Sequence, residues 1–344
     1  MPTTETQDKL YCGSDLHGNN VFLTLCDQEG QRVMQRRVKA NLVSVNQALE
    51  PYMERIESIA VESTFNWYWF VDGLKDQGVD VKLANPARMM QYSGLKSSDD
   101  KTDAGWIAEQ LRLGILPEGY IYPREVRPVR DLLRRRMFIV RQRMETILSC
   151  ESLFARHAWK WPGATEFKKW TMDSVRALQP DTFTELQLGT LLELVRKQND
   201  LALWIETKIK QELKPNSEYK RIQTVPGIGL ILGMVILLES GEFSRFPSAG
   251  DYASYCRTVQ SKRVSNDKQK GTNNRKNGNR YLSWAFAEAG IYAIRYYPKI
   301  KSWYERKKRR SNIPKAQRAL ACKLAKATWH VMNGNEFKEE MLFR

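Results

Sequence analysis

The stretch KLYCGSDLHGNNVFLTLCDQEGQRVMQRRVKAN, residues 9–41, decides the fold class of the N-terminal region of the chain. It contains three short runs rich in apolar residues, which are separated by the Gly-containing turns HGNN and QEGQ. This pattern predicts three consecutive β-strands arranged as a meander.

The segments that follow the meander alternate between helical and strand patterns. VSVNQALEPYMERI has helical spacing, and a second helix is expected from about Trp67 to Gln77. SIAVEST (58–64) and VDVKLANP (79–86) are short apolar runs, which are typical of buried parallel strands. Together with a helix after Pro86, this order predicts an α/β domain over residues 1–125, with helices packed on a mixed sheet.

The rest of the chain has a helical pattern, so the fold class is α/β plus all-α. Residues 126–215 contain two long amphipathic runs, which predict either a coiled coil, antiparallel or between copies, or a helical bundle within one chain. Residues 216–344 form the third predicted region. It contains TVPGIG, the sequence form of a helix-hairpin-helix, in which Gly227 and Gly229 would let backbone N–H groups approach a phosphate.

Composition excludes several classes of protein. The 344 residues are 42% apolar, and no apolar run approaches the roughly 18 to 20 residues of a membrane helix. The N-terminus is polar, so we expect a cytoplasmic protein without a membrane partner. The five cysteines form no CxxC pair and the three histidines lie far apart, which argues against a zinc site, a disulfide framework and a Ser-His-Asp triad.

Positive charge is concentrated in one segment of the chain. The net charge is +16, and residues 257–310 carry +13 of it. Such a block indicates a polyanion partner, although a solvated basic face without a specific partner remains the alternative. The side chains expected to contact nucleic acid are those of Lys262, Arg263, Lys268, Lys270, Arg275, Lys276, Asn279 and Arg280.

Acidic residues follow two predicted strands and begin one predicted helix. SSDDKTDAGWIAEQL (97–111) places Asp100 and Asp103 three apart at a helix start, where they either cap the helix or share a metal ion. Asp15 ends the first strand and Glu62 closes the fourth, and such strand ends meet helix starts along one edge of an α/β fold. Capping explains any one of these acids better than all four. Four converging carboxylates favour a hard cation, Mg²⁺ or alternatively Mn²⁺.

Six segments resemble one protein family: GSDLH, VEST, DDKTDAGWIAEQLRLGILPEGYIYP, TVPGIG, RFPSAGDYASYC and KNGNRYLSWAFAEA. They are similar to the DEDD serine transposases of bacterial insertion sequences, also called bridge-RNA-guided recombinases, to which the DNA invertase Piv is related. The resemblance implies a RuvC-like domain of RNase H fold with Asp15, Glu62, Asp100 and Asp103 as its metal-binding set. It also implies DNA strand cleavage and rejoining through a covalent phosphoserine.

The same resemblance implies the partners and the nucleophile. The partners are donor and target DNA, a structured non-coding RNA that chooses both sites, and further copies of the chain, from dimer to tetramer, joined through the middle helices. The family pattern places the serine after ASY and before GN, where Ser261 and Ser265 lie. We favour Ser265, but Asn266 and Asp267 follow it where many relatives have glycine, so the choice stays open.

Three alternatives to a transposase give different expectations. A site-specific invertase of the same family would use the same chemistry. A hydrolytic RNase H-like nuclease, such as a junction resolvase, would need the four acids but no serine. A non-catalytic nucleic-acid-binding module would be unaffected by loss of Asp15.

Overall fold

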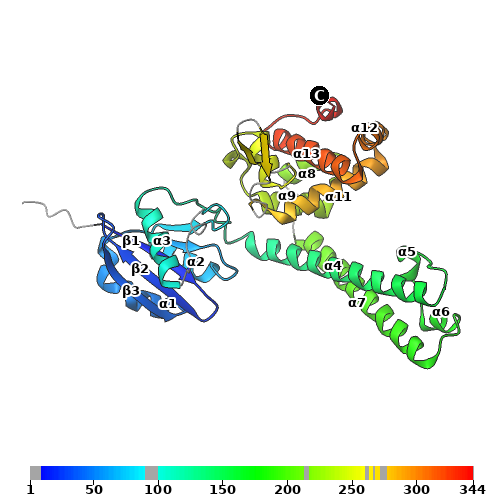
Figure 1. Cartoon of the computed structure of the whole chain (residues 1–344), viewed down its shortest axis with the longest axis horizontal. Helices are drawn as coiled ribbons and strands as arrows, with labels where there is room; N and C mark the ends of the chain where they lie inside the picture. Colours follow the sequence, from blue (N-terminus) through cyan, green and yellow to red (C-terminus); the bar gives the residue numbers. More distant parts are fainter. Residues whose placement is uncertain are drawn as a thin grey trace, which may run out of the picture. The chain divides into compact units, whose positions relative to one another are not determined.

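The computed structural model describes residues 9–89, 100–212, 217–259, 263–265, 268–271 and 277–343. The chain divides into two compact units, Met1–Ile121 and Tyr122–Arg344, which are described separately (Figure 1). Among the described residues, no helix combines the length and the apolar character that a membrane crossing requires.

A five-stranded mixed sheet forms the centre of the first unit. Its strands are β1 (Leu10–Leu16), β2 (Asn20–Cys26), β3 (Arg32–Lys39), β4 (Ile56–Glu62) and β5 (Val81–Ala84), in the order β3-β2-β1-β4-β5. The first three strands pair antiparallel, which confirms the predicted meander, and β4 and β5 extend the sheet in parallel with β1. This arrangement is consistent with an RNase H-like domain.

One face of this sheet carries the larger apolar core. Alternate residues of the central strands, including Cys12, Leu23 and Ile59, are buried there with apolar residues of α1 (Leu42–Leu49) and α2 (Tyr68–Lys75). A 3-10 helix, η1 (Glu50–Arg55), leads from α1 into β4. The predicted helix from Trp67 to Gln77 therefore exists, although its regular turns already end at Lys75.

The other face of the sheet receives α3 (Asp100–Arg112), because the residues there are small. Ala60 and Ala84 pack against Ile107 of α3. A Cβ added to Gly13 would lie 2.1 Å from the carbonyl oxygen of Ala104 and 2.3 Å from the backbone nitrogen of Ala108. The backbone of α3 thus lies directly on β1, a packing that only glycine at position 13 permits.

The second unit begins with a long helical hairpin. The helices α4 (Arg127–Arg156) and α7 (Thr182–Glu212) run side by side in opposite directions, joined through α5 (Ala164–Phe167) and α6 (Met172–Arg176) (Figure 1). Arg136 forms an ion pair with Glu206, and seven residues further along α4 Arg143 donates to Asn199. The two helices therefore pair within one chain, whereas a coiled coil between copies stays a prediction.

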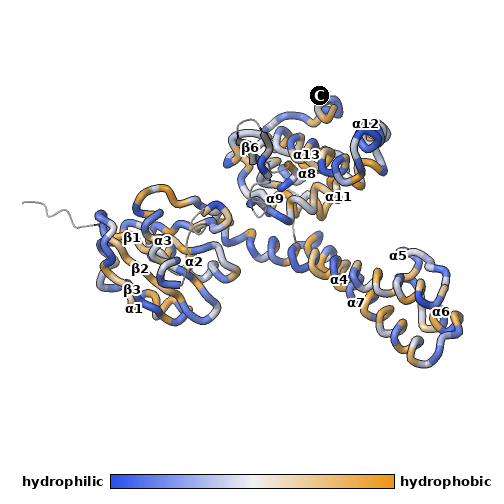
Figure 2. The backbone as a smooth tube through the Cα atoms, viewed as in Figure 1, coloured by the Kyte–Doolittle hydropathy of each residue, from blue (hydrophilic) through white to orange (hydrophobic). Residues whose placement is uncertain are grey.

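Helices also dominate the rest of this unit. The elements are α8 (Ser217–Ile222), α9 (Leu230–Ser240), η2 (Phe243–Arg245), α10 (Ala249–Tyr255), β6 (Arg263–Ser265), β7 (Lys268–Gly271), α11 (Arg280–Tyr296), α12 (Pro298–Arg309), α13 (Ile313–Met332) and η3 (Glu339–Leu342). Tyr252, Phe286 and Leu324 are fully buried where α10, α11 and α13 meet. Figure 2 shows apolar and polar residues alternating along α4 and α7, as expected of helices with one buried face.

The division into units differs in one respect from the three predicted regions. The boundary after Ile121 lies close to the predicted end of the α/β domain at residue 125. The hairpin and the C-terminal helices belong to one unit, so the predicted boundary between 215 and 216 has no counterpart in this division.

Candidate active site

Two of the predicted acids lie next to each other at the ends of parallel strands. Ser14 of β1 is in register with Val61 of β4, so the next residue on each strand, Asp15 and Glu62, also lie opposite each other. Side chains alternate along a strand, which puts Asp15 on the same face as Gly13, the face that α3 covers. Asp15 is buried, and Glu62 is partly buried.

The first turn of α3 supplies Asp100 and Asp103 to the same region. A histidine joins them: Nε2 of His17 lies 3.0 Å from Oδ2 of Asp15 and 3.2 Å from Oδ1 of Asp100. Single ligand atoms of Asp15, His17 and Asp100 all lie within 4.8 Å of one another. His17 was not among the predicted site residues, although its position two residues after Asp15, where β1 ends, was a usable signal.

Burial and neighbouring acids raise the pKa values of the two carboxyl groups on the strands. Burial raises the pKa of Asp15, His17 opposes this effect, and the charges of Asp100 and Asp103 raise the pKa further. Burial also raises the pKa of Glu62, with contributions in the same direction from Asp15 and Asp103. Helix capping would account for Asp100 and Asp103 but not for two acids on strands, and the side chains that the structure brings within 4.8 Å of one another are those of Asp15, His17 and Asp100.

These residues fit a divalent cation. Partly buried carboxylates that destabilise each other's charge are stabilised when a cation lies between them. Carboxylate oxygens with one imidazole nitrogen suit Mg²⁺ or Mn²⁺, whereas zinc sites usually contain cysteine or several histidines. Asp15, His17 and Asp100 have ligand atoms close enough to share such an ion, whereas a contribution of Glu62 and Asp103 stays a prediction.

The predicted serine lies in a polar segment between α10 and α11. Ser265 is the last residue of β6, and its backbone pairs with Lys268 of β7. Lys270 and Arg280 are exposed, as expected of residues that contact nucleic acid. The backbones of Arg263 and Lys268 lie in β6 and β7. Ser261, Lys262, Arg275 and Lys276 lie outside the described residues.

The two ends of this segment are held together by hydrogen bonds to main-chain carbonyl groups. Nε of Arg257 donates to the carbonyl oxygens of Asn277 and Gly278 over 3.1 and 2.9 Å. The backbone nitrogen of Asn279 donates to the carbonyl oxygen of Tyr255 over 2.6 Å. Gly278 has a φ of +89°, and a Cβ there would lie 2.5 Å from the same Tyr255 oxygen. Arg257, Asn277, Gly278 and Asn279 therefore form a closed base, where the segment that carries Ser265 begins and ends.

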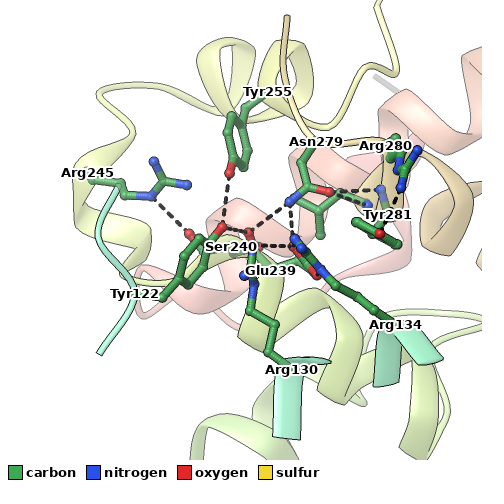
Figure 3. Close-up of polar contacts among 11 residues, drawn as sticks. Tyr122, Arg130, Arg134, Glu239, Ser240, Arg245, Tyr255, Asn279, Arg280 and Tyr281 are labelled. Atoms are coloured by element: carbon green, nitrogen blue, oxygen red, sulfur yellow. Dashed lines mark hydrogen bonds and ion pairs between the residues drawn. The ribbon is translucent and has the colours of Figure 1, made fainter. Parts of the chain in front are cut away.

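A buried carboxylate, Glu239 at the end of α9, supports this base (Figure 3). Oε2 of Glu239 accepts hydrogen bonds from Arg134 over 2.8 Å and from Asn279 over 2.7 Å, and Arg130 lies 3.1 Å away. The hydroxyl of Tyr122 donates to the Glu239 carbonyl oxygen, and the Arg130 guanidinium stacks on the Tyr122 ring. Burial alone would raise the pKa of Glu239, but the contacts with Arg134, Arg130 and Asn279 lower it, so the group is ionised.

Two residues expected to bind nucleic acid have structural roles in the fold. The side chain of Asn279 is buried; its oxygen accepts from the backbone nitrogens of Tyr281 and Leu282, which caps α11, and its nitrogen donates to Glu239. Gly227 has a φ of +79°, and a Cβ there would lie 2.0 Å from the carbonyl oxygen of Ala289, so it allows close packing on α11. Gly229 is exposed at the start of α9, and its predicted phosphate contact stays a prediction.

Comparisons with known proteins match both units. Residues 12–157 match a family model described as a transposase, the DEDD transposase of IS110, and residues 219–305 match the model of the transposase IS116/IS110/IS902 family. The chain is 23% identical over 335 residues to the transposase for insertion sequence element IS1111A of Coxiella burnetii, with 94% of this chain and 90% of that relative covered. The first match includes all four acids, and the second includes Ser265 and Glu239. The chain is therefore a DNA transposase that belongs to the IS110 family of insertion-sequence transposases.

Proposed function

We propose that this transposase cuts and rejoins DNA in a metal-dependent reaction that passes through a phosphoserine intermediate. The cluster of Asp15, His17 and Asp100, with Glu62 at the end of the strand next to Asp15, is the observation that supports the metal dependence. A bound Mg²⁺ or Mn²⁺ would supply charge stabilisation at a phosphate under attack. The buried position of Asp15 and its contact with His17 keep the site in a fixed geometry.

We assign the nucleophile to Ser265, with Ser261 as the alternative. The serine hydroxyl gives up its proton as its Oγ forms a bond to phosphorus. The bond from phosphorus to the departing strand's oxygen breaks, and that oxygen takes up a proton as it leaves. Attack by a strand hydroxyl on the phosphoserine reverses these changes and rejoins DNA. The closed base of the segment, formed by Arg257, Asn277, Gly278 and Asn279, supports this role because a nucleophile must be held in position.

The partners in this proposal are donor DNA, target DNA and a structured non-coding RNA. The excess of positive charge in residues 257–310 supports binding to nucleic acid in general. The RNA rests on the family resemblance.

We also propose that copies of the chain associate through the hairpin of α4 and α7. Large apolar side chains on the hairpin are exposed, and packing against a second copy would remove them from water. They are Phe138, Met144, Leu148, Phe183, Leu186, Leu194, Leu203 and Trp204. Sedimentation velocity of Leu194→Glu with Trp204→Glu tests this, since the pair should reduce the mass of the assembly while Leu113→Glu in the first unit should not.

Covalent capture tests the reaction itself. Full-length protein, Mg²⁺, RNA from the flanking region and DNA that spans the element junction are mixed and run on a denaturing gel. We expect a protein–DNA adduct with the wild type and with Ser261→Ala, and none with Ser265→Ala or Asp103→Ala. Cleavage without an adduct would identify a hydrolytic nuclease and remove the serine from the mechanism. An adduct that persists in Asp103→Ala would remove the acids.

A further inference from the structure

We propose that Arg37 and Lys39 of β3 bind the phosphodiester backbone of the DNA strand that enters the acid cluster. The inference rests on the proposed function, because it takes the cluster of Asp15, Glu62, Asp100 and Asp103 as the place where that strand is cut. It adds a binding surface and a direction along which the strand crosses the sheet.

Strand register puts Arg37 on the same face of the sheet as Asp15. Asp15 of β1 is directly opposite Phe22 of β2, and Phe22 is directly opposite Arg37 of β3. Residues directly opposite each other point to the same face, and adjacent strands lie about 4.8 Å apart. The backbone of Arg37 is therefore roughly 10 Å from that of Asp15, across two strand spacings. Lys39 lies two residues further along β3, on the same face.

Both cations are available to a ligand. Arg37 and Lys39 are exposed, and neither forms an ion pair with the residues that the structure describes. Their strand is the edge of the sheet, beyond the strands β1, β2 and β4 that α3 covers. At the opposite edge, Lys82 of β5 lies 3.6 Å from Asp80 and 3.7 Å from Glu118, so its charge is already balanced.

The ligand that the cations would bind is a polyanion. Each phosphate of a DNA strand carries one negative charge, so a strand that reaches the acid cluster also brings its neighbouring phosphates close to the cluster. Carboxylates alone would repel this polyanion. Arg37 and Lys39, on the same face, would hold the phosphates next to the acids without adding positive charge inside the metal site.

Protection of the sheet edge is a different explanation for the basic residues on β3, and Arg36 of the same strand is the control that distinguishes it from DNA binding. Exposed edge strands often carry positive charges that prevent pairing with the edges of other molecules. Arg36 is also exposed, but it is opposite Leu23 and hence on the face that α1 and α2 cover. Edge protection would use Arg36 and Arg37 alike, whereas a DNA contact beside Asp15 would use Arg37 and Lys39 but not Arg36.

Disulfide cross-linking measures the proximity directly and does not depend on cleavage. Arg37→Cys, Lys39→Cys and Arg36→Cys are made in full-length protein carrying Cys322→Ser, because the other four cysteines are buried. The probe is junction DNA with an activated disulfide tethered to single phosphates near the cut, together with the flanking RNA. We expect the cross-link at positions 37 and 39, at least about fivefold above position 36. Equal yields at 36 and 37, or cross-links to a similarly modified RNA and not to DNA, would overturn the proposal.

Kinetics supply the second measurement. Arg37→Gln should raise the KM for DNA about tenfold, the effect of losing one charge-assisted hydrogen bond. The slope of log affinity against log salt should fall in magnitude by about one, and Arg36→Gln should change neither quantity. Asp103→Asn separates the two proposals: it should abolish cleavage and leave the cross-link at position 37. If Asp103→Asn still cleaves DNA, the proposed function fails whatever the cross-link shows.

Discussion

The side-chain nitrogen of Asn279 donates to Oε2 of Glu239 over 2.7 Å, although the two residues lie 40 positions apart in the sequence. Arg134 and Arg130 of α4 contact the same carboxylate. One buried acid therefore joins the end of α9, the hairpin helix α4 and the start of α11. Because Asn279 also closes the base of the segment that carries Ser265, the position of that segment depends on a buried charge.

Replacement of Asn279 should destabilise the protein without weakening its contacts with DNA directly. Asn279→Ala removes the cap of α11 and leaves Glu239 with one partner fewer, so the free energy of unfolding should fall by about 2 kcal/mol. Asn277→Ala is the control, because that side chain is exposed, and it should change the free energy by less than about 0.5 kcal/mol. Urea denaturation measures both variants. A smaller salt slope of DNA binding in Asn279→Ala would instead restore the expected phosphate contact.

The stability that Glu239 contributes should depend on pH. Its pKa in the folded protein is lowered from the usual 4.5, because the two arginines and Asn279 outweigh the effect of burial. A lowered folded-state pKa contributes stability above the unfolded pKa, and this stability is lost as the pH falls through the folded value. Glu239→Gln should therefore cost about 3 kcal/mol at pH 7, and the difference from wild type should shrink below about pH 4.5. Urea titrations at pH 7, 5 and 3.5 measure the difference; a constant value across this range would contradict the ion-pair explanation.

The glycine at position 13 should control both stability and the acid cluster. Gly13→Ala places a Cβ where the backbone of α3 lies, so α3 must move away from β1 together with Asp100 and Asp103. We expect a loss of about 3 kcal/mol in the free energy of unfolding and a large fall in the cleavage rate. Gly18→Ala is the matched control in the same unit, since nothing lies within 4 Å of a Cβ there. Comparable stability of the two variants would show that α3 is not seated on β1.

Local patterns predicted the first unit well, and long-range pairing explains what they missed. The meander, β4, β5 and the acids at the strand ends follow from alternation of apolar residues and from turns, which are properties of neighbouring residues. The buried role of Glu239 depends on arginines about a hundred residues earlier, so the sequence signal was only a single acid at the end of an apolar helix. The structural role of Asn279 was not predicted, because its neighbours in the sequence are basic and suggested a contact with nucleic acid instead. The hairpin of β6 and β7 was not predicted, since its short runs RVS and KQKG lack the alternation of apolar residues that marks a strand.

The acid cluster should limit stability in the absence of metal and increase it when metal is present. The pKa of Asp15 in the folded protein is raised, first by burial and then by Asp100 and Asp103 against the opposing effect of His17. A raised folded-state pKa gives stability that is complete below the unfolded value of 3.8 and is lost as the pH rises through the folded value. Asp15→Asn stays neutral, so without metal its melting temperature relative to wild type should increase from pH 4 to pH 7.

At a Mn²⁺ concentration of 100 times the Kd, wild type should gain about 2.7 kcal/mol in the free energy of unfolding and Asp15→Asn much less. Asp80→Asn, which alters an exposed carboxylate in the same unit, should respond to Mn²⁺ as the wild type does. Differential scanning fluorimetry measures all three proteins, and an equal gain in Asp15→Asn would place the cation elsewhere.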